Sequence, residues 1–217
     1  LQKIANEVTP LLSKHRDDIN LNEKLFQRVK AVYALKKTLK LTPEQSKLLD
    51  DTYKDFVRGG ANLSGPAKER FRNINEESSM LRLKFEENVL KETNSFRLVI
   101  DKTEDLAGLS QTIIDGAAEA AKKAKMEGKW VFTLQKPSMI PFLQYAENRA
   151  LREKLLKGYI MRGDNSNQYD NKEIVATIAA LRVERSKLLG YKSFADFALE
   201  QNMAKNPSTV YDFLNKL

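Results

Sequence analysis

The stretch LRVERSKLLGYKSFADF, residues 181–197, decides the fold class because it holds a complete helix end and a complete helix start. Gly190 stands where a helix commonly ends in a left-handed residue, a conformation that glycine adopts without strain. Ser193 follows at a position that suits the N-cap of the next helix. The stretch therefore predicts two helices joined by a glycine turn, and its paired arginines need a separate explanation.

The same kinds of signal predict helices along most of the chain. Thr42, Pro43 and Gln45 form the pattern of an N-cap, a first-turn proline and a capping box. Pro66 opens the longest expected helix, whose apolar side should continue to about Thr93. Further helices are predicted over residues 110–126 and from Asn148, Asp170 and Asn206 onward.

Two short apolar segments, at about 96–101 and 129–134, have the composition of strands rather than helices. Prolines at 137 and 141 then interrupt the pattern. We place a domain boundary there, which gives a first domain of residues 1–137 and a second of residues 138–217. The predicted fold is mainly α, an array of antiparallel helical hairpins with a minor two-stranded β element.

The residue inventory excludes several kinds of active site. The chain has 217 residues, 41% of them hydrophobic, which is enough for a packed core, but it has no cysteine and a single histidine. A catalytic zinc site usually needs several imidazoles or thiolates, so none can be assembled here. Ile4, Leu11 and His15 share one side of the first expected helix, so we interpret His15 as a packed or boundary residue rather than a general base. No catalytic or metal-binding residue is predicted.

The net charge of +8 permits binding to acidic partners. Acidic residues are interspersed among the basic ones, which is the ordinary pattern of solvated helix faces. A basic helical module that binds nucleic acid stays open as an alternative, because of clusters such as Lys122, Lys123 and Lys125. A protein-interaction module of helical hairpins is a further alternative.

Nothing in the sequence predicts a membrane-spanning segment, since no apolar run approaches about 18 residues. The first residues mix acidic and polar groups with apolar ones and do not form a signal peptide. The absence of cysteine fits a reducing compartment. We therefore expect the cytoplasm, with the bacterial periplasm as the alternative.

A family resemblance covers nearly the whole chain. NRALREKLLKGYIMRG (148–163), YDNKEIVATIAALRVERSKLLGYKSFADFALEQNMA (169–204) and VYDFLNKL (210–217) resemble the helical region of the thimet oligopeptidase and bacterial peptidyl-dipeptidase family of zinc metallopeptidases. Residues 41–93 are similar to the amino-terminal helices of that family, and KWVFTLQKPS (129–138) to its connecting segment. The most specific match is LLGY (188–191) after Leu181 and Arg182.

The resemblance implies a mostly helical, clam-like peptidase whose walls enclose a deep channel for short peptides. Zinc would be its cofactor, and release of dipeptides from peptide carboxyl ends its expected reaction. The family's His-Glu-x-x-His motif is absent from these residues. The chain would then be the amino-terminal, non-catalytic wall that restricts access by size, inactive alone and packed against the remainder of its own protein.

The same resemblance suggests a role for Arg182 and Arg185. We interpret them as ion-paired supports of the helix packing, and lining of a substrate channel that attracts peptide carboxylates is the alternative. The chain starts at Leu1 and stops within a helical pattern, so we expect a piece of a longer protein. An apolar stripe near its end should then lack its cover from the longer protein and find another partner, either a second copy of the chain or an earlier helix; it consists of Val210, Phe213, Leu214 and Leu217.

Overall fold

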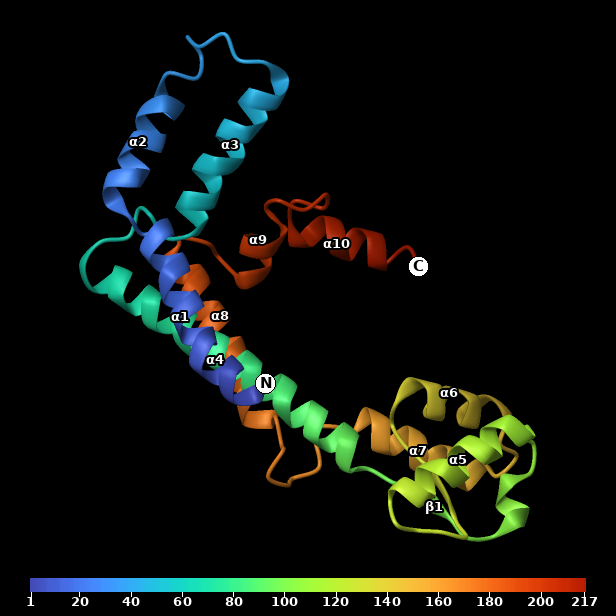
Figure 1. The fold of residues 1–217 in the computed structure, drawn as a ribbon. Coiled ribbons are helices and arrows are strands. Elements are labelled where there is room, and N and C mark those ends of the chain that lie inside the picture. Colours follow the sequence, from blue (N-terminus) through green and yellow to red (C-terminus); the bar gives the residue numbers. More distant parts are fainter. The chain divides into compact units, whose positions relative to one another are not determined.

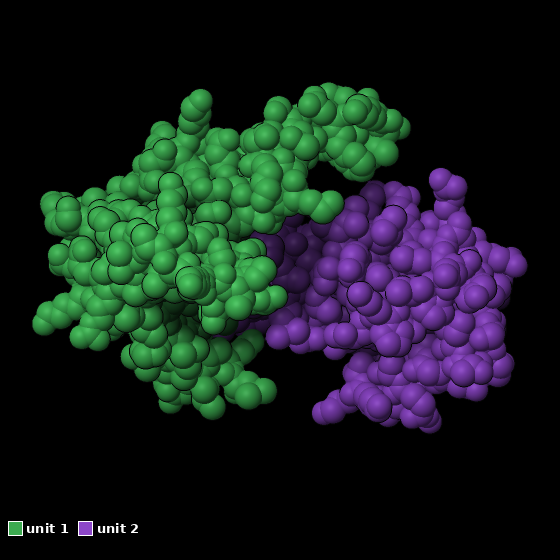
Figure 2. Space-filling model, turned by 90° about the horizontal axis from the view of Figure 1, so that it is seen from above, with its two compact units in different colours: residues 1–83, 174–217 green, residues 84–173 purple.

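The computed structural model describes residues 1–217, with ten α-helices, one short 3-10 helix and two strands (Figure 1). The chain forms two compact units (Figure 2): unit 1 comprises residues 1–83 and 174–217, and unit 2 comprises residues 84–173. The prediction of a mainly α fold is confirmed. The expected boundary at residue 137, which lies within a helix of unit 2, stays a prediction.

Unit 1 is entirely helical. Its helices are α1 (Gln2–Asn20), α2 (Glu23–Ala34), α3 (Pro43–Arg58), the first part of α4 (Gly65–Ser95), nearly all of α8 (Lys172–Leu188), α9 (Phe194–Leu199) and α10 (Pro207–Leu214). Helices α2 and α3 form an antiparallel hairpin, in which the rings of Tyr33 and Tyr53 stack with their centroids 4.0 Å apart. Helices α1, α4 and α8 lie alongside one another, joined by side-chain hydrogen bonds (Figure 1).

The helix starts follow the local signals of the sequence. Thr42 and Gln45 make the expected capping box, because each side chain accepts a hydrogen bond from the backbone N–H of the other. Gly190 has a φ of +85°, the left-handed conformation predicted for the end of α8. N-caps are also confirmed at Asn148, Ser193 and Asn206.

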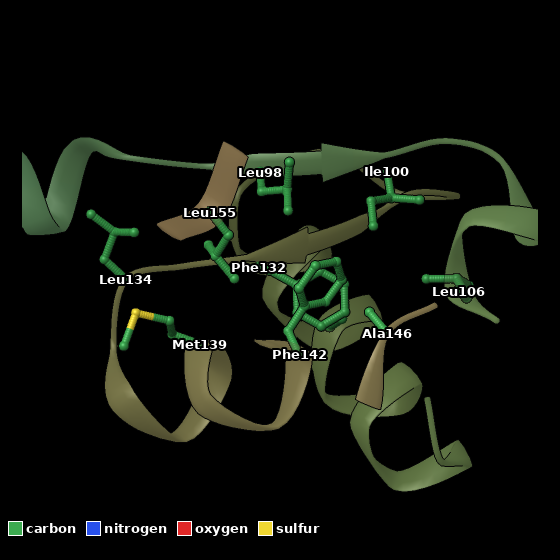
Figure 3. Close-up of a cluster of buried hydrophobic side chains, with 10 residues drawn as sticks. Leu98, Ile100, Leu106, Phe132, Leu134, Met139, Phe142, Ala146 and Leu155 are labelled. Carbon is green, nitrogen blue, oxygen red and sulfur yellow. The ribbon is translucent and has the colours of Figure 1, made fainter. Parts of the chain in front are cut away.

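Unit 2 contains the small β element, β1 (Leu98–Ile100) paired antiparallel with β2 (Trp130–Phe132). Both expected strands are confirmed, each three residues long. The other elements that lie wholly in this unit are the 3-10 helix η1 (Thr103–Leu106), α5 (Gln111–Lys123), α6 (Lys136–Tyr145) and α7 (Arg149–Ile160). Figure 3 shows the buried core of unit 2, to which both strands and these helices contribute. The ring centroids of Phe132 and Phe142 in this core are 4.4 Å apart.

Helix α1 corrects one sequence-based interpretation. Ile4 and Leu11 are exposed, and His15 is exposed as well, so the interpretation of His15 as a packed or boundary residue was wrong. The buried residue of α1 is Asp17, which is only 5% exposed. The polar side of α1 faces the interior of unit 1 because Asn75 on α4 offers a hydrogen-bond donor to Asp17.

The apolar stripe at the end of the chain is largely uncovered, so no earlier helix takes the place of its expected partner. Phe213, Leu214 and Leu217 are exposed, whereas Val210 is half-buried. None of the helices combines the length and low charge needed to cross a membrane.

Candidate functional site

The two arginines singled out by the sequence lie at the same pocket of unit 1. This pocket has a volume of about 350 Å³ and is lined mainly by α1, α4 and α8. Arg182 and Arg185 of α8 line it together with Arg16 of α1 and Arg82 of α4. We call the cavity bounded by these four residues the arginine pocket.

Helical periodicity explains why the polar groups converge. On α8, Arg182 and Arg185 are three residues apart and therefore share a face. On α4, Asn75, Ser79 and Arg82 follow the same spacing, and on α1 the polar lining residues Thr9, Ser13, Arg16, Asp17 and Asn20 do so as well. Three helices thus contribute a polar stripe each to one cavity.

Arg185 is the most constrained of the four arginines. Its guanidinium carbon lies 5.0 Å from the ring centroid of Phe71 and 4.9 Å from that of Phe197. Its Nε donates a hydrogen bond to Oδ1 of Asn75, 3.2 Å away. Burial lowers the pKa of Arg185, and the positive charges of Arg82 and Arg58 lower it further. The side chain nevertheless stays charged, because guanidinium remains protonated in proteins.

Asp17 is the only acidic residue of the pocket lining. Its Oδ1 accepts a hydrogen bond from Nδ2 of Asn75 at 2.8 Å, so Asn75 links this carboxylate to Arg185. Burial raises the pKa of Asp17, against the opposing effects of the Asn75 hydrogen bond and the charges of Arg72 and Arg185. The pocket therefore combines four cations with one buried carboxylate whose charged form is disfavoured.

Three other arginines of unit 1 have carboxylate partners. They form three pairs: Arg58 with Glu200, Arg70 with Glu184, and Arg72 with Asp18. The Arg70 pair is bidentate, with donor–acceptor distances of 2.7 and 2.6 Å. Glu200, Glu184 and Asp18 are thus paired with arginines outside the pocket lining.

The four arginines of the pocket have no such partners. No carboxylate oxygen lies within 4.0 Å of a guanidinium nitrogen of Arg16, Arg82, Arg182 or Arg185. The ion pairs expected for Arg182 and Arg185 are therefore absent, although Arg185 does support the helix packing through Asn75, Phe71 and Phe197. Arg182 instead lies over the ring of Phe194, 5.1 Å from its centroid. The role of both residues in a substrate channel stays a prediction.

Sequence reasoning missed Arg16, Arg82 and Asp17. A signal was present, because polar residues recur at helical spacing on α1 and α4. Such stripes are also typical of helix faces that point to solvent. Whether two polar faces pack against each other depends on contacts between distant parts of the chain, so the stripes alone do not predict the pocket.

A second buried carboxylate lies in unit 2. Glu92 of α4 accepts hydrogen bonds from the backbone N–H of Gly163, from Nδ2 of Asn165 at 3.0 Å and from Nδ2 of Asn167 at 2.6 Å. Burial by itself raises its pKa, but these three donors outweigh that effect and hold the pKa below its usual value. Glu92 thereby fixes the loop that leads from α7 to α8.

The zinc implied by the family resemblance does not fit these residues. The sole histidine, His15, is exposed on α1, and no group of three or more histidine, cysteine, aspartate or glutamate side chains could hold a metal ion. Four-coordinate zinc sites draw on such groups, so no zinc chemistry can be derived from this chain.

Comparison with known proteins relates the chain to peptidases. The model of "Peptidase family M3" matches residues 142–217. Over its full length the chain is 33% identical to oligopeptidase A of Haemophilus influenzae and 30% identical to dipeptidyl carboxypeptidase of Escherichia coli, covering 32% of each protein. A probable cytosolic oligopeptidase A of Arabidopsis thaliana is 31% identical over 94% of the chain and 30% of that protein. The chain thus spans about a third of the length of these relatives.

Proposed function

We propose that this chain forms the amino-terminal helical wall of a zinc-dependent oligopeptidase or peptidyl-dipeptidase. It is similar along its whole length to oligopeptidase A and dipeptidyl carboxypeptidase, and over residues 142–217 to the model of peptidase family M3. One observation carries the proposal: the similarity takes in all of the chain but only about a third of each relative. The zinc ligands and catalytic groups then belong to the other two thirds of the protein. The chain contributes shape and charge to a channel that admits short peptides.

The uncovered apolar surface supports this role. Leu11 on α1 and Phe213 on α10 are each more than 60% exposed, and Leu217 is 90% exposed. Exposed apolar area costs about 25 cal/mol per Å², so exposed apolar side chains such as those at the end of the chain favour a partner. In the proposal that partner is the remainder of the same protein, which works in the cytoplasm on short peptides.

The experiment compares this 217-residue chain with the product of the complete gene that encodes it. Both are incubated with zinc and with quenched peptides of increasing length. The complete product should cleave short peptides but not folded proteins, whereas the chain alone should cleave neither, since it lacks a zinc site. A complete reading frame without a His-Glu-x-x-His motif, or metal-dependent cleavage by the chain alone, would contradict the proposal.

A further inference from the structure

We infer that the arginine pocket of unit 1 is a binding site for a polyvalent oxyanion, the phosphate or diphosphate group of a small molecule. The inference concerns unit 1 alone and does not depend on the proposed peptidase role. It starts from the convergence of Arg16, Arg82, Arg182 and Arg185 on one cavity.

The charge of the pocket is the first argument. Four guanidinium groups face one buried carboxylate, that of Asp17, which already shares a hydrogen bond with Asn75. Arg185 is half-buried, whereas Arg16, Arg82 and Arg182 are exposed at the rim of the pocket. Like charges repel one another, and the positive charge of Arg82 acts on the half-buried Arg185. Glu200, Glu184 and Asp18 are paired with Arg58, Arg70 and Arg72, which lie outside this pocket lining. An anion of more than one charge would supply the missing counter-charge.

The donors are the second argument. Guanidinium groups present planar pairs of N–H donors that match the oxygens of phosphate in bidentate fashion. Hydroxyl groups also line the pocket, from Thr9 and Ser13 of α1 and from Ser78 and Ser79 of α4. Guanidinium groups beside hydroxyl donors suit a ligand such as phosphate, in which several acceptor oxygens surround one phosphorus atom.

Preorganisation is the third argument. Arg185 is held between the rings of Phe71 and Phe197, and its Nε is fixed by Asn75. Arg182 is steadied by the ring of Phe194. Such supports lower the entropy lost on binding, because the side chains are already positioned. A merely solvated arginine would have no comparable set of contacts.

A monovalent peptide carboxylate fits this pocket less well. A single carboxylate would balance only one of the four arginines, and its planar geometry offers two oxygens to a set of donors that comes from three helices. The volume of about 350 Å³ is large enough for a small phosphorylated molecule.

The test uses the 217-residue chain and inorganic diphosphate as the probe, with calorimetry and thermal unfolding as readouts. Binding at a single site should raise the unfolding temperature by about 5 °C at a concentration about 100 times Kd. Chloride and acetate at the same ionic strength should produce no such rise. Adenosine diphosphate in a second arm distinguishes a site for a free anion from one for the phosphate end of a larger molecule.

Matched variants test the location of the site. Arg182→Gln and Arg82→Gln should each weaken diphosphate binding at least about tenfold, since each removes a charged donor from the pocket. The controls Lys187→Gln on α8 and Lys84→Gln on α4 remove the same charge from the same helices at exposed positions outside the pocket, and should leave Kd within about twofold. Arg185→Lys keeps the charge and loses the planar fork, so it should weaken binding even if the fold is intact.

Three results would overturn the inference. The first is an absence of saturable diphosphate binding by the folded chain. The second is equal weakening by the pocket variants and the control variants, which would assign binding to the net charge. The third is tighter binding of a short acidic peptide than of diphosphate, which would make the pocket a subsite for peptides.

Discussion

Replacement of Glu92 by glutamine should destabilise the protein more than any exposed carboxylate-to-amide change on the same helix. Glu92 is 5% exposed and accepts hydrogen bonds from Gly163, Asn165 and Asn167. The Glu92→Gln variant keeps one acceptor oxygen but turns the other into an NH₂ group that faces a donor. Each carboxylate oxygen accepts two of the four hydrogen bonds, so two of the four are then lost or repulsive.

The magnitude follows from the kind of hydrogen bond that is removed. A hydrogen bond to a charged group contributes about 1.5–3 kcal/mol to the net stability, and a buried donor left without a partner costs about 1–3 kcal/mol. Allowing for relaxation of the loop, we expect the free energy of unfolding to fall by about 3 kcal/mol.

The pH dependence has a defined sign. Because the pKa of Glu92 is lower in the folded protein than its ordinary value of 4.5, the folded state favours the charged carboxylate. This contribution to stability is fully present above the pKa of the unfolded chain and is lost as the pH falls through the pKa of the folded state. The difference between the wild type and Glu92→Gln should therefore shrink as the pH decreases below about 4.5.

Urea unfolding of both proteins, followed by circular dichroism at a series of pH values, measures this difference. Glu86→Gln is the matched control, since Glu86 is exposed on the same helix, and it should change the stability by less than about 0.5 kcal/mol. A loss of similar size in Glu86→Gln, or a Glu92→Gln loss that does not vary with pH, would refute the reasoning.

Two further pairs of variants test the packing of unit 2 by the same urea titration. Leu155→Ala should lower the free energy of unfolding by about 3–5 kcal/mol, since Leu155 is 0% exposed, whereas Leu156→Ala at a 46% exposed position should cost less than about 1 kcal/mol; equal losses would contradict the core assignment. Gly158→Ala should destabilise by about 1–3 kcal/mol, because its Cβ would lie 2.3 Å from an aromatic carbon, while Gly116→Ala in α5 meets no atom within 4 Å and should stabilise by about 0.5–1 kcal/mol. A stabilising Gly158→Ala would show that α7 packs differently.

The sequence predicted the features of this fold that depend on neighbouring residues. Thr42 and Gln45 specify their capping box within four residues, and Gly190 specifies a helix end by its own conformational freedom. The two strands were also predictable, because short apolar segments beside turn residues favour them.

The orientation of α1 was not predictable by the same means. Its apolar stripe suggested one buried side, yet Asp17 on the other side is buried. The partner that makes this possible, Asn75, lies 58 positions along the chain, and Arg185 lies a further 110 positions beyond Asn75. The arginine pocket depends on the same distant contacts, so the sequence identified Arg182 and Arg185 but not Arg16 or Arg82.

The division of unit 1 into two chain segments has a consequence for biosynthesis. Residues 84–173 form a compact unit from one continuous segment, so this unit can fold on the ribosome as soon as it has emerged. Unit 1 has to wait for residues 174–217, and until then Asp17 and Asn75 lack Arg185. Bringing α8 back to α4 across a flexible segment of this length would cost about 4 kcal/mol of chain entropy. A unit 2 that has already folded brings the two ends of the segment closer together and lowers this cost. The nascent chain is therefore expected to expose the interior face of α1 to chaperones for longer than any part of unit 2.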